Sequence, residues 1–152
     1  MKPIASFTIN HNTLVPGFYI SRTDGDVVTY DVRFKAPNAG DYLTDGAMHT
    51  IEHLFATYMR NTAQADAVIY VGPMGCRTGF YLLMRDTVPP SLARALTREA
   101  MEYIRTYEGP VPGATKAACG NYRSHSLPGA RRAAAALLAA LDRQPEGFSY
   151  PD

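Results

Sequence analysis

Two histidines and a glutamate stand at a spacing that suits metal-assisted chemistry. His49, Glu52 and His53 form a His-x-x-Glu-His motif. Side chains four residues apart share one face of an α-helix, so the two imidazoles can bind one metal ion with Glu52 beside it. A helix with two solvated histidines is the alternative. The glutamate within the pair, and two cysteines elsewhere in the chain, favour a metal site.

A catalytic zinc-type site needs a third protein ligand and leaves one coordination position open. Cys119 is the best candidate, because a thiolate is a strong soft ligand and the adjacent Gly120 lets a loop approach closely. Free cysteines are also common as small buried hydrophobic residues, and that alternative remains open for Cys119.

Cys76 is a second sulfur in a position to do chemistry. It follows Gly75 in a turn between two predicted strands. A free thiol is largely protonated at neutral pH, so it needs a nearby cation to act as a base or a nucleophile. Arg33, near the end of another predicted strand, could supply that charge. Taken alone, Arg33 and His11 are more typical of solvated surface residues.

These groups together predict proton transfers next to a polarised carbonyl. A metal ion acts as the Lewis acid, Glu52 moves protons, and Cys76 acts as an activated thiol. This set suits isomerisation of a hydroxy-aldehyde followed by elimination beside a ketone.

The elements that must position these residues predict an α+β fold: a small antiparallel or mixed sheet packed against three to four helices. Hydrophobic alternation and turn signals place strands at 4–9, from 18 onward, and at 28–34, 67–71 and 79–85. Helices are predicted at 46–62, 90–106 and 128–142. Thr44 or Asp45 can cap the first helix. Residues 143–152 have the composition of a loose tail.

Length and composition limit the classes of protein. The 152 residues fit one domain, 1–152, and the net charge of +1 gives no reason to expect a nucleic-acid surface. Two cysteines are too few for a disulfide framework and suit a reducing compartment. We find no signal-peptide pattern and no apolar run long enough to span a membrane, so a cytoplasmic location is expected.

Five blocks of sequence, in order, resemble the S-ribosylhomocysteine lyase (LuxS) family over nearly the whole chain. They are Ser6-Phe7 with His11, Asp31-Val32-Arg33-Phe34, His49-Thr50-Ile51-Glu52-His53, Pro73-Met74-Gly75-Cys76-Arg77-Thr78-Gly79, and Cys119-Gly120-Asn121-Tyr122. The resemblance implies cleavage of S-ribosylhomocysteine to homocysteine and 4,5-dihydroxy-2,3-pentanedione. This reaction belongs to the activated methyl cycle and supplies the autoinducer precursor of quorum sensing.

The resemblance also implies residue roles. His49, His53 and Cys119 match the metal ligands, with water as the fourth ligand, and Glu52 and Cys76 match the acid–base pair. Substrate-binding positions are matched by Ser6, His11, Arg33, Arg60 and Tyr81. The implied metal is Fe2+, with Zn2+ or Co2+ as substitutes. The implied assembly is a homodimer, with two active sites at the subunit interface.

The chain departs from the family pattern before the Cys76 block. Tyr70 and Gly72 stand where the family commonly has aspartate and serine, at contacts to the amino-acid end of the substrate. Asn10 replaces a usual aspartate before His11, and the segment between His11 and Arg33 is shorter than usual.

Two other functions fit part of the pattern. His-x-x-Glu-His is also the inverted-zincin motif of metallopeptidases, which needs a downstream glutamate ligand such as Glu99, Glu102 or Glu108. That class gives the two cysteines no role. A non-catalytic domain with a structural metal would instead close the site with a fourth protein ligand, Cys76 or His125.

Overall fold

The computed structural model describes all 152 residues and has an antiparallel four-stranded sheet at its centre. The strands are β1 (Gly17–Asp24), β2 (Val27–Arg33), β3 (Val68–Pro73) and β4 (Gly79–Arg85). Their order across the sheet is β1-β2-β4-β3, so β2 and β4 are the central pair. Every neighbouring pair is antiparallel, which confirms the predicted sheet.

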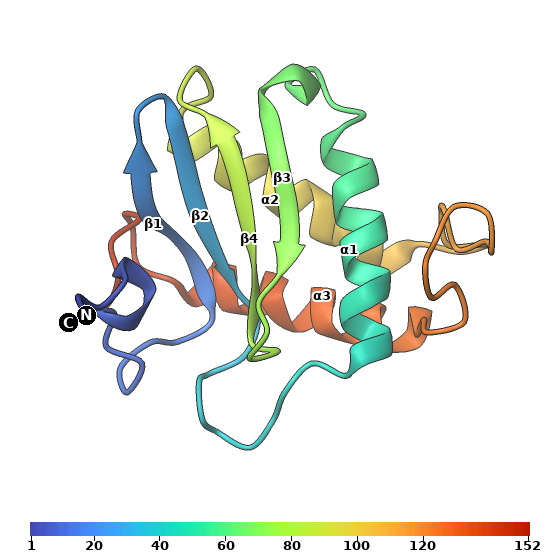
Figure 1. Ribbon diagram of the computed structural model, residues 1–152, viewed down its shortest axis with the longest axis horizontal. Helices are drawn as coiled ribbons and strands as arrows, with labels where there is room; N and C mark the ends of the chain where they lie inside the picture. Colours follow the sequence, from blue (N-terminus) through green and yellow to red (C-terminus); the bar gives the residue numbers. More distant parts are fainter.

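Three α-helices complete the fold: α1 (Asp45–Met59), α2 (Pro90–Thr106) and α3 (Leu127–Arg143). Figure 1 shows α2 and α3 behind the sheet and α1 standing beside β3. A single cluster of 28 buried apolar residues joins these helices to the sheet. Its sheet side includes Tyr30, Val32, Phe80 and Leu82, the alternate residues expected from strand geometry. The α+β fold class is thereby confirmed.

The start of α1 is fixed by a side-chain cap. Thr44 has an extended backbone, and its hydroxyl accepts a hydrogen bond from the backbone N–H of Ala47. This satisfies one of the amide donors that a helix leaves unpaired in its first turn. Thr44, rather than Asp45, is therefore the cap. The two histidines of α1 are half-buried and lie outside the apolar core cluster.

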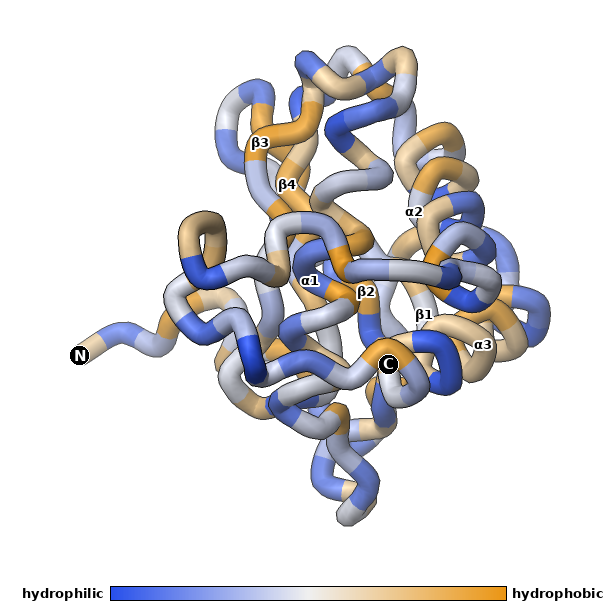
Figure 2. Tube along the Cα trace, turned by 90° about the vertical axis from the view of Figure 1, so that its right-hand side faces the viewer, coloured by the Kyte–Doolittle hydropathy of each residue, from blue (hydrophilic) through white to orange (hydrophobic).

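The prediction for residues 4–9 was wrong. Ala5–Phe7 form a short 3-10 helix instead of a strand, with no buried residue. Phe7 is 75% exposed and Ile4 58% exposed, so alternation in this segment reflects no sheet face. Figure 2 shows the N-terminal end of the chain standing away from the body of the molecule.

The prediction of a loose C-terminal tail was also wrong. The Gln144 side chain accepts from the N–H of Phe18 and donates to its carbonyl, both at 2.8 Å. The N–H of Ile20 donates to the Phe148 carbonyl at 2.8 Å. The ring of Tyr150 stacks on Tyr19 at 5.1 Å between centroids. The tail therefore lies along β1, where it pairs with backbone groups of an edge strand.

No helix in the structure has the length and apolar composition required to cross a membrane.

Candidate metal centre and active site

Helix α1 and the loop between α2 and α3 bring three predicted ligands together. The Cys119 Sγ atom lies 3.4 Å from His49 Nε2 and 3.9 Å from His53 Nε2. Zinc–nitrogen bonds of about 2.1 Å and zinc–sulfur bonds of about 2.3 Å at tetrahedral angles separate such donors by about 3.6 Å. The three donor atoms are thus spaced as ligands of one ion would be.

Backbone carbonyls of the loop orient both imidazoles. His49 Nδ1 donates to the Ser124 carbonyl, and His53 Nδ1 donates to the Pro112 carbonyl, each at 2.7 Å. With the proton held on Nδ1, each ring presents the lone pair of Nε2 to the cluster. Gly113 follows with φ +71, and an added Cβ there would stand 3.3 Å from His53 Nδ1. A glycine lets the loop turn this close to the ring.

His125 is the fourth member of the cluster, in which all four donor atoms lie within 4.8 Å of one another. Its Nδ1 pairs with the Thr50 hydroxyl at 2.9 Å, and its buried Nε2 has no partner. Burial, together with the positive charge that His49 and His53 can carry, lowers the pKa of His125 and favours its neutral form. The chain itself thus offers this buried nitrogen no hydrogen-bond partner.

The His125 ring, however, stacks on His49 with centroids 3.9 Å apart and planes only 20° from parallel. An imidazole binds a metal in its own ring plane, so two stacked rings cannot both converge on one ion. His49, His53 and Cys119 therefore fit a metal with one coordination position left for another molecule, the pattern of a catalytic centre. The structure does not favour the closed, purely structural site.

Glu52 lies on α1 between the two histidines and is half-buried. Its carboxylate takes part in none of the ion pairs of the chain. A carboxylate that lies beside a candidate metal centre and has no ion-pair partner is available to move protons.

A separate hollow of about 360 Å³ collects the remaining predicted site residues except Arg60. The N-terminal segment, β2, the β3–β4 turn and β4 line it with Ser6, His11, Arg33, Cys76 and Tyr81. Burial, followed by the charge of Asp31, raises the pKa of Tyr81, which stays a phenol and a hydrogen-bond donor. Five side chains from three separate stretches of the sequence thus line one hollow.

Arg33 is almost fully buried in this hollow, at 2% exposure, rather than solvated. Its guanidinium binds both oxygens of the buried Asp31, through Nε at 3.1 Å and Nη2 at 2.6 Å. Burial lowers the pKa of Arg33, but the hydrogen bond and charge of Asp31 outweigh it, and the net shift is upward. Arg33 is a permanent cation held in place by its counter-ion.

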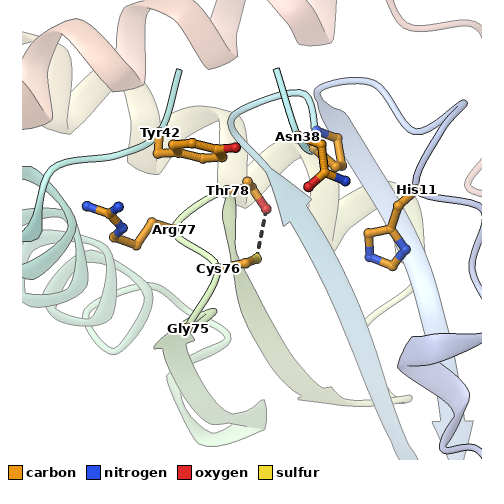
Figure 3. A pocket seen from close by; sticks show the side chains of 8 residues that line it. His11, Asn38, Tyr42, Gly75, Cys76, Arg77 and Thr78 are labelled. Carbon is orange, nitrogen blue, oxygen red and sulfur yellow. Dashed lines mark hydrogen bonds between the residues drawn. The ribbon is translucent and has the colours of Figure 1, made fainter. Parts of the chain in front are cut away.

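Cys76 adjoins that cation through one hydroxyl. Arg33 Nη1 donates to Thr78 Oγ1 at 2.7 Å, and Thr78 Oγ1 lies 3.0 Å from Cys76 Sγ. Thr78 and Cys76 also line a second hollow of about 320 Å³. Figure 3 shows Cys76 facing the space between His11 and Tyr42 in this hollow. Cys76 is therefore exposed to two adjoining hollows, with buried charge on one side.

The metal cluster and the Cys76 hollows are distinct places in the chain. Neither hollow is lined by His49, His53, Cys119 or Glu52. In Figure 1 the loop between α2 and α3 lies beyond α1, on the side away from β3. One chain thus carries two groups of candidate functional residues that do not share a cavity.

Arg60 lies outside both hollows. Its guanidinium donates to the carbonyls of Val68 and Ile69, at 3.3 and 3.1 Å, where it joins the end of α1 to β3. Its role in substrate binding stays a prediction.

Tyr70 and Gly72, the two residues of β3 that depart from the family pattern, contact each other in the structure. A Cβ added at Gly72 would lie 2.4 Å from the Tyr70 hydroxyl oxygen. The tyrosine ring therefore occupies space that a serine at position 72 would need.

Sequence reasoning did not assign roles to Asp31 and Thr78, and it placed His125 only in a closed metal site. The pairing of Asp31 with Arg33 could have been predicted, because residues two apart in a strand lie on the same face. The Thr78 contact depends on the β2–β4 register, in which Arg33 pairs with Gly79, and the sequence alone does not give that register.

The fold and the cluster define a small α+β protein that could hold a catalytic metal ion. Comparison with known proteins is more specific, because the family model S-Ribosylhomocysteinase (LuxS) matches residues 4–146. S-ribosylhomocysteine lyase of Clostridium acetobutylicum is 44% identical over 100% of both chains. The enzyme of the same name from Phocaeicola vulgatus is 47% identical over 91% of this chain and 89% of its own. That of Borreliella afzelii is 41% identical over 99% of this chain and 100% of its own. The chain belongs to the S-ribosylhomocysteinase (LuxS) family.

Proposed function

We propose that the chain is a metal-dependent S-ribosylhomocysteine lyase, a carbon–sulfur lyase that releases homocysteine and 4,5-dihydroxy-2,3-pentanedione. The observation that carries this proposal is the convergence of His49, His53 and Cys119 at ligand spacing, with a coordination position left open. Relatives named for this activity match the chain over its full length. The metallopeptidase alternative leaves Cys76 and Cys119 without a role.

When bound, the metal supplies Lewis-acid polarisation of a carbonyl or hydroxyl oxygen of the substrate. The residues of the chain then move protons. Glu52 and Cys76 take protons from ribose carbons and return them to neighbouring positions, which shifts the carbonyl along the sugar. Removal of a proton next to the shifted carbonyl breaks the carbon–sulfur bond, and the homocysteine thiolate leaves and takes up a proton. His11, Arg33 and Tyr81 hold substrate oxygens in the hollow.

A second copy of the chain completes each active site in this proposal. Glu52 and the metal ligands lie apart from Cys76 within one chain, so chemistry that needs both groups needs two chains. Each Cys76 hollow also has an exposed aromatic side chain in its lining that a partner would cover: Phe7 in one and Tyr42 in the other. A two-fold dimer would pair each metal cluster with the other chain's hollow and form two equal sites.

Mixing two inactive variants tests this assembly. Glu52→Gln and Cys76→Ala should each fold and keep the metal, and each should lose nearly all thiol release from S-ribosylhomocysteine. When the two are unfolded together and refolded, half of the dimers are mixed and carry one intact site of two. About a quarter of the wild-type activity should return. Self-mixed samples of each variant are the control, and no recovery would place both groups in one chain.

The proposed native metal is Fe2+, with Zn2+ or Co2+ as functional substitutes, since two imidazoles and a thiolate suit all three ions. Anaerobic purification followed by elemental analysis should give about one metal ion per chain. The dihydroxypentanedione product would be the autoinducer precursor of quorum sensing.

A further inference from the structure

A line of hydrogen bonds, buried in its middle part, runs from the C-terminal tail to Cys76. The Tyr150 hydroxyl donates to Asp31 Oδ2 at 2.7 Å. Asp31 binds Arg33, Arg33 binds the Thr78 hydroxyl, and that hydroxyl contacts Cys76 Sγ. Four consecutive contacts thus join a residue near the end of the chain to the thiol.

We propose that Thr78 and Tyr150 are positioning residues for the Cys76 site, the two ends of a relay through Asp31 and Arg33. The inference rests on the proposed function in one respect: Cys76 is taken as an acid–base residue of the lyase reaction. Neither Thr78 nor Tyr150 needs to touch the substrate.

The direction of the hydrogen bonds gives Thr78 its role. The guanidinium of Arg33 can only donate, so Thr78 Oγ1 accepts from it. The hydroxyl proton of Thr78 is then free to point at Cys76 Sγ, 3.0 Å away. A hydroxyl that accepts from a cation donates more strongly, and a donor aimed at sulfur stabilises the thiolate. Arg33 therefore acts on Cys76 through Thr78.

Tyr150 holds the far end of the relay. Asp31 is fully buried, so its oxygens depend on protein donors, and Tyr150 provides the one donor besides Arg33. Burial, followed by the charge of Asp31, strongly raises the pKa of Tyr150, which keeps the hydroxyl proton available for donation. Stacking on Tyr19 and the Gln144 contacts with β1 hold the tyrosine there.

The chain offers variants that separate a hydroxyl from the space it fills. Thr78→Val removes the hydroxyl at nearly equal volume, and Thr78→Ser restores it. Tyr150→Phe keeps the stacked ring. Tyr58→Phe is the control, since the Tyr58 hydroxyl also donates to a carboxylate, Glu99, but at an exposed place outside both Cys76 hollows.

Two readouts are compared on metal-loaded protein: steady-state lyase kinetics, and the alkylation rate of Cys76 by iodoacetamide, resolved from Cys119 by peptide mass spectrometry. Thr78→Val should slow alkylation about 10-fold and lower kcat at least as much, with KM changed less than about twofold. Thr78→Ser should recover to within about threefold of wild type. Tyr150→Phe should slow both readouts by about threefold to fivefold, and Tyr58→Phe should slow neither.

A wild-type alkylation rate in Thr78→Val would overturn the inference, and so would a Thr78→Ser variant as slow as Thr78→Val. Equal urea midpoints for Tyr150→Phe and wild type would exclude loosening of the tail as the cause of any slowing. Failure of the wild-type protein to release thiol from S-ribosylhomocysteine would contradict the proposed function. The alkylation rates of the variants would still show whether Thr78 and Tyr150 act on Cys76, because that measurement needs no substrate.

Discussion

The metal cluster and the Cys76 hollows are held in place by different forces. Helix α1 presents the two histidines at one-turn spacing, and neutral backbone carbonyls of a loop orient them. Cys76 instead adjoins a buried ion pair, Asp31 with Arg33, that packing encloses on the sheet. The cluster could hold a metal ion from outside the chain, whereas the polar contacts around Cys76 are made by residues of the chain itself. Loss of the metal should therefore disable the first region, and loss of one charge of the ion pair should destabilise the second.

The largest expected effect comes from removing a ligand. His53→Ala leaves two of three protein donors, so metal affinity should fall by more than about 100-fold and thiol release should disappear. Elemental analysis of the purified variant and the thiol assay measure both losses. A variant that retains one tightly bound ion per chain would contradict the ligand assignment.

The second effect concerns stability. Asp31→Ala leaves the Arg33 cation buried without its counter-ion, and breaking a buried pair in this way costs about 3–5 kcal/mol. Urea unfolding should show this loss as a lower midpoint, with the same dependence of the unfolding free energy on urea concentration as wild type. Asp26→Ala is the control, because it breaks the exposed pair with Arg85 and should cost about 0–1 kcal/mol. Similar costs for the two variants would mean that the Asp31–Arg33 pair does not stabilise the fold.

The sequence predicted the two regions unequally well, for physical reasons. The His49–His53 pair follows from helical periodicity, which is local, and Cys119 follows from ligand chemistry. The Cys76 surroundings depend on strand register and on chain ends that pack across the sheet. Tyr150 reaches Asp31 over a separation of 119 residues, and no short-range pattern contains that contact. The same limit explains the wrong strand at 4–9 and the tail that was expected to be loose.

The smallest expected effect tests how the loop supports the metal ligands. Gly113→Ala places a Cβ at φ +71 and 3.3 Å from His53 Nδ1, so the ring or the loop must shift. The hydrogen bond from His53 to Pro112 should weaken, and metal affinity should fall by about threefold to tenfold in a chelator competition assay.

Gly109→Ala separates the two causes of that loss. It lies in the same loop at φ +103, and an added Cβ there would meet nothing within 4 Å. Both variants bear the backbone cost of a side chain in the left-handed region, about 1–2 kcal/mol. Only Gly113→Ala crowds a ligand. Gly109→Ala should therefore lower the midpoint of urea unfolding without lowering metal affinity. If both variants lower metal affinity equally, then the rigidity of the whole loop, rather than the contact at His53, determines metal affinity.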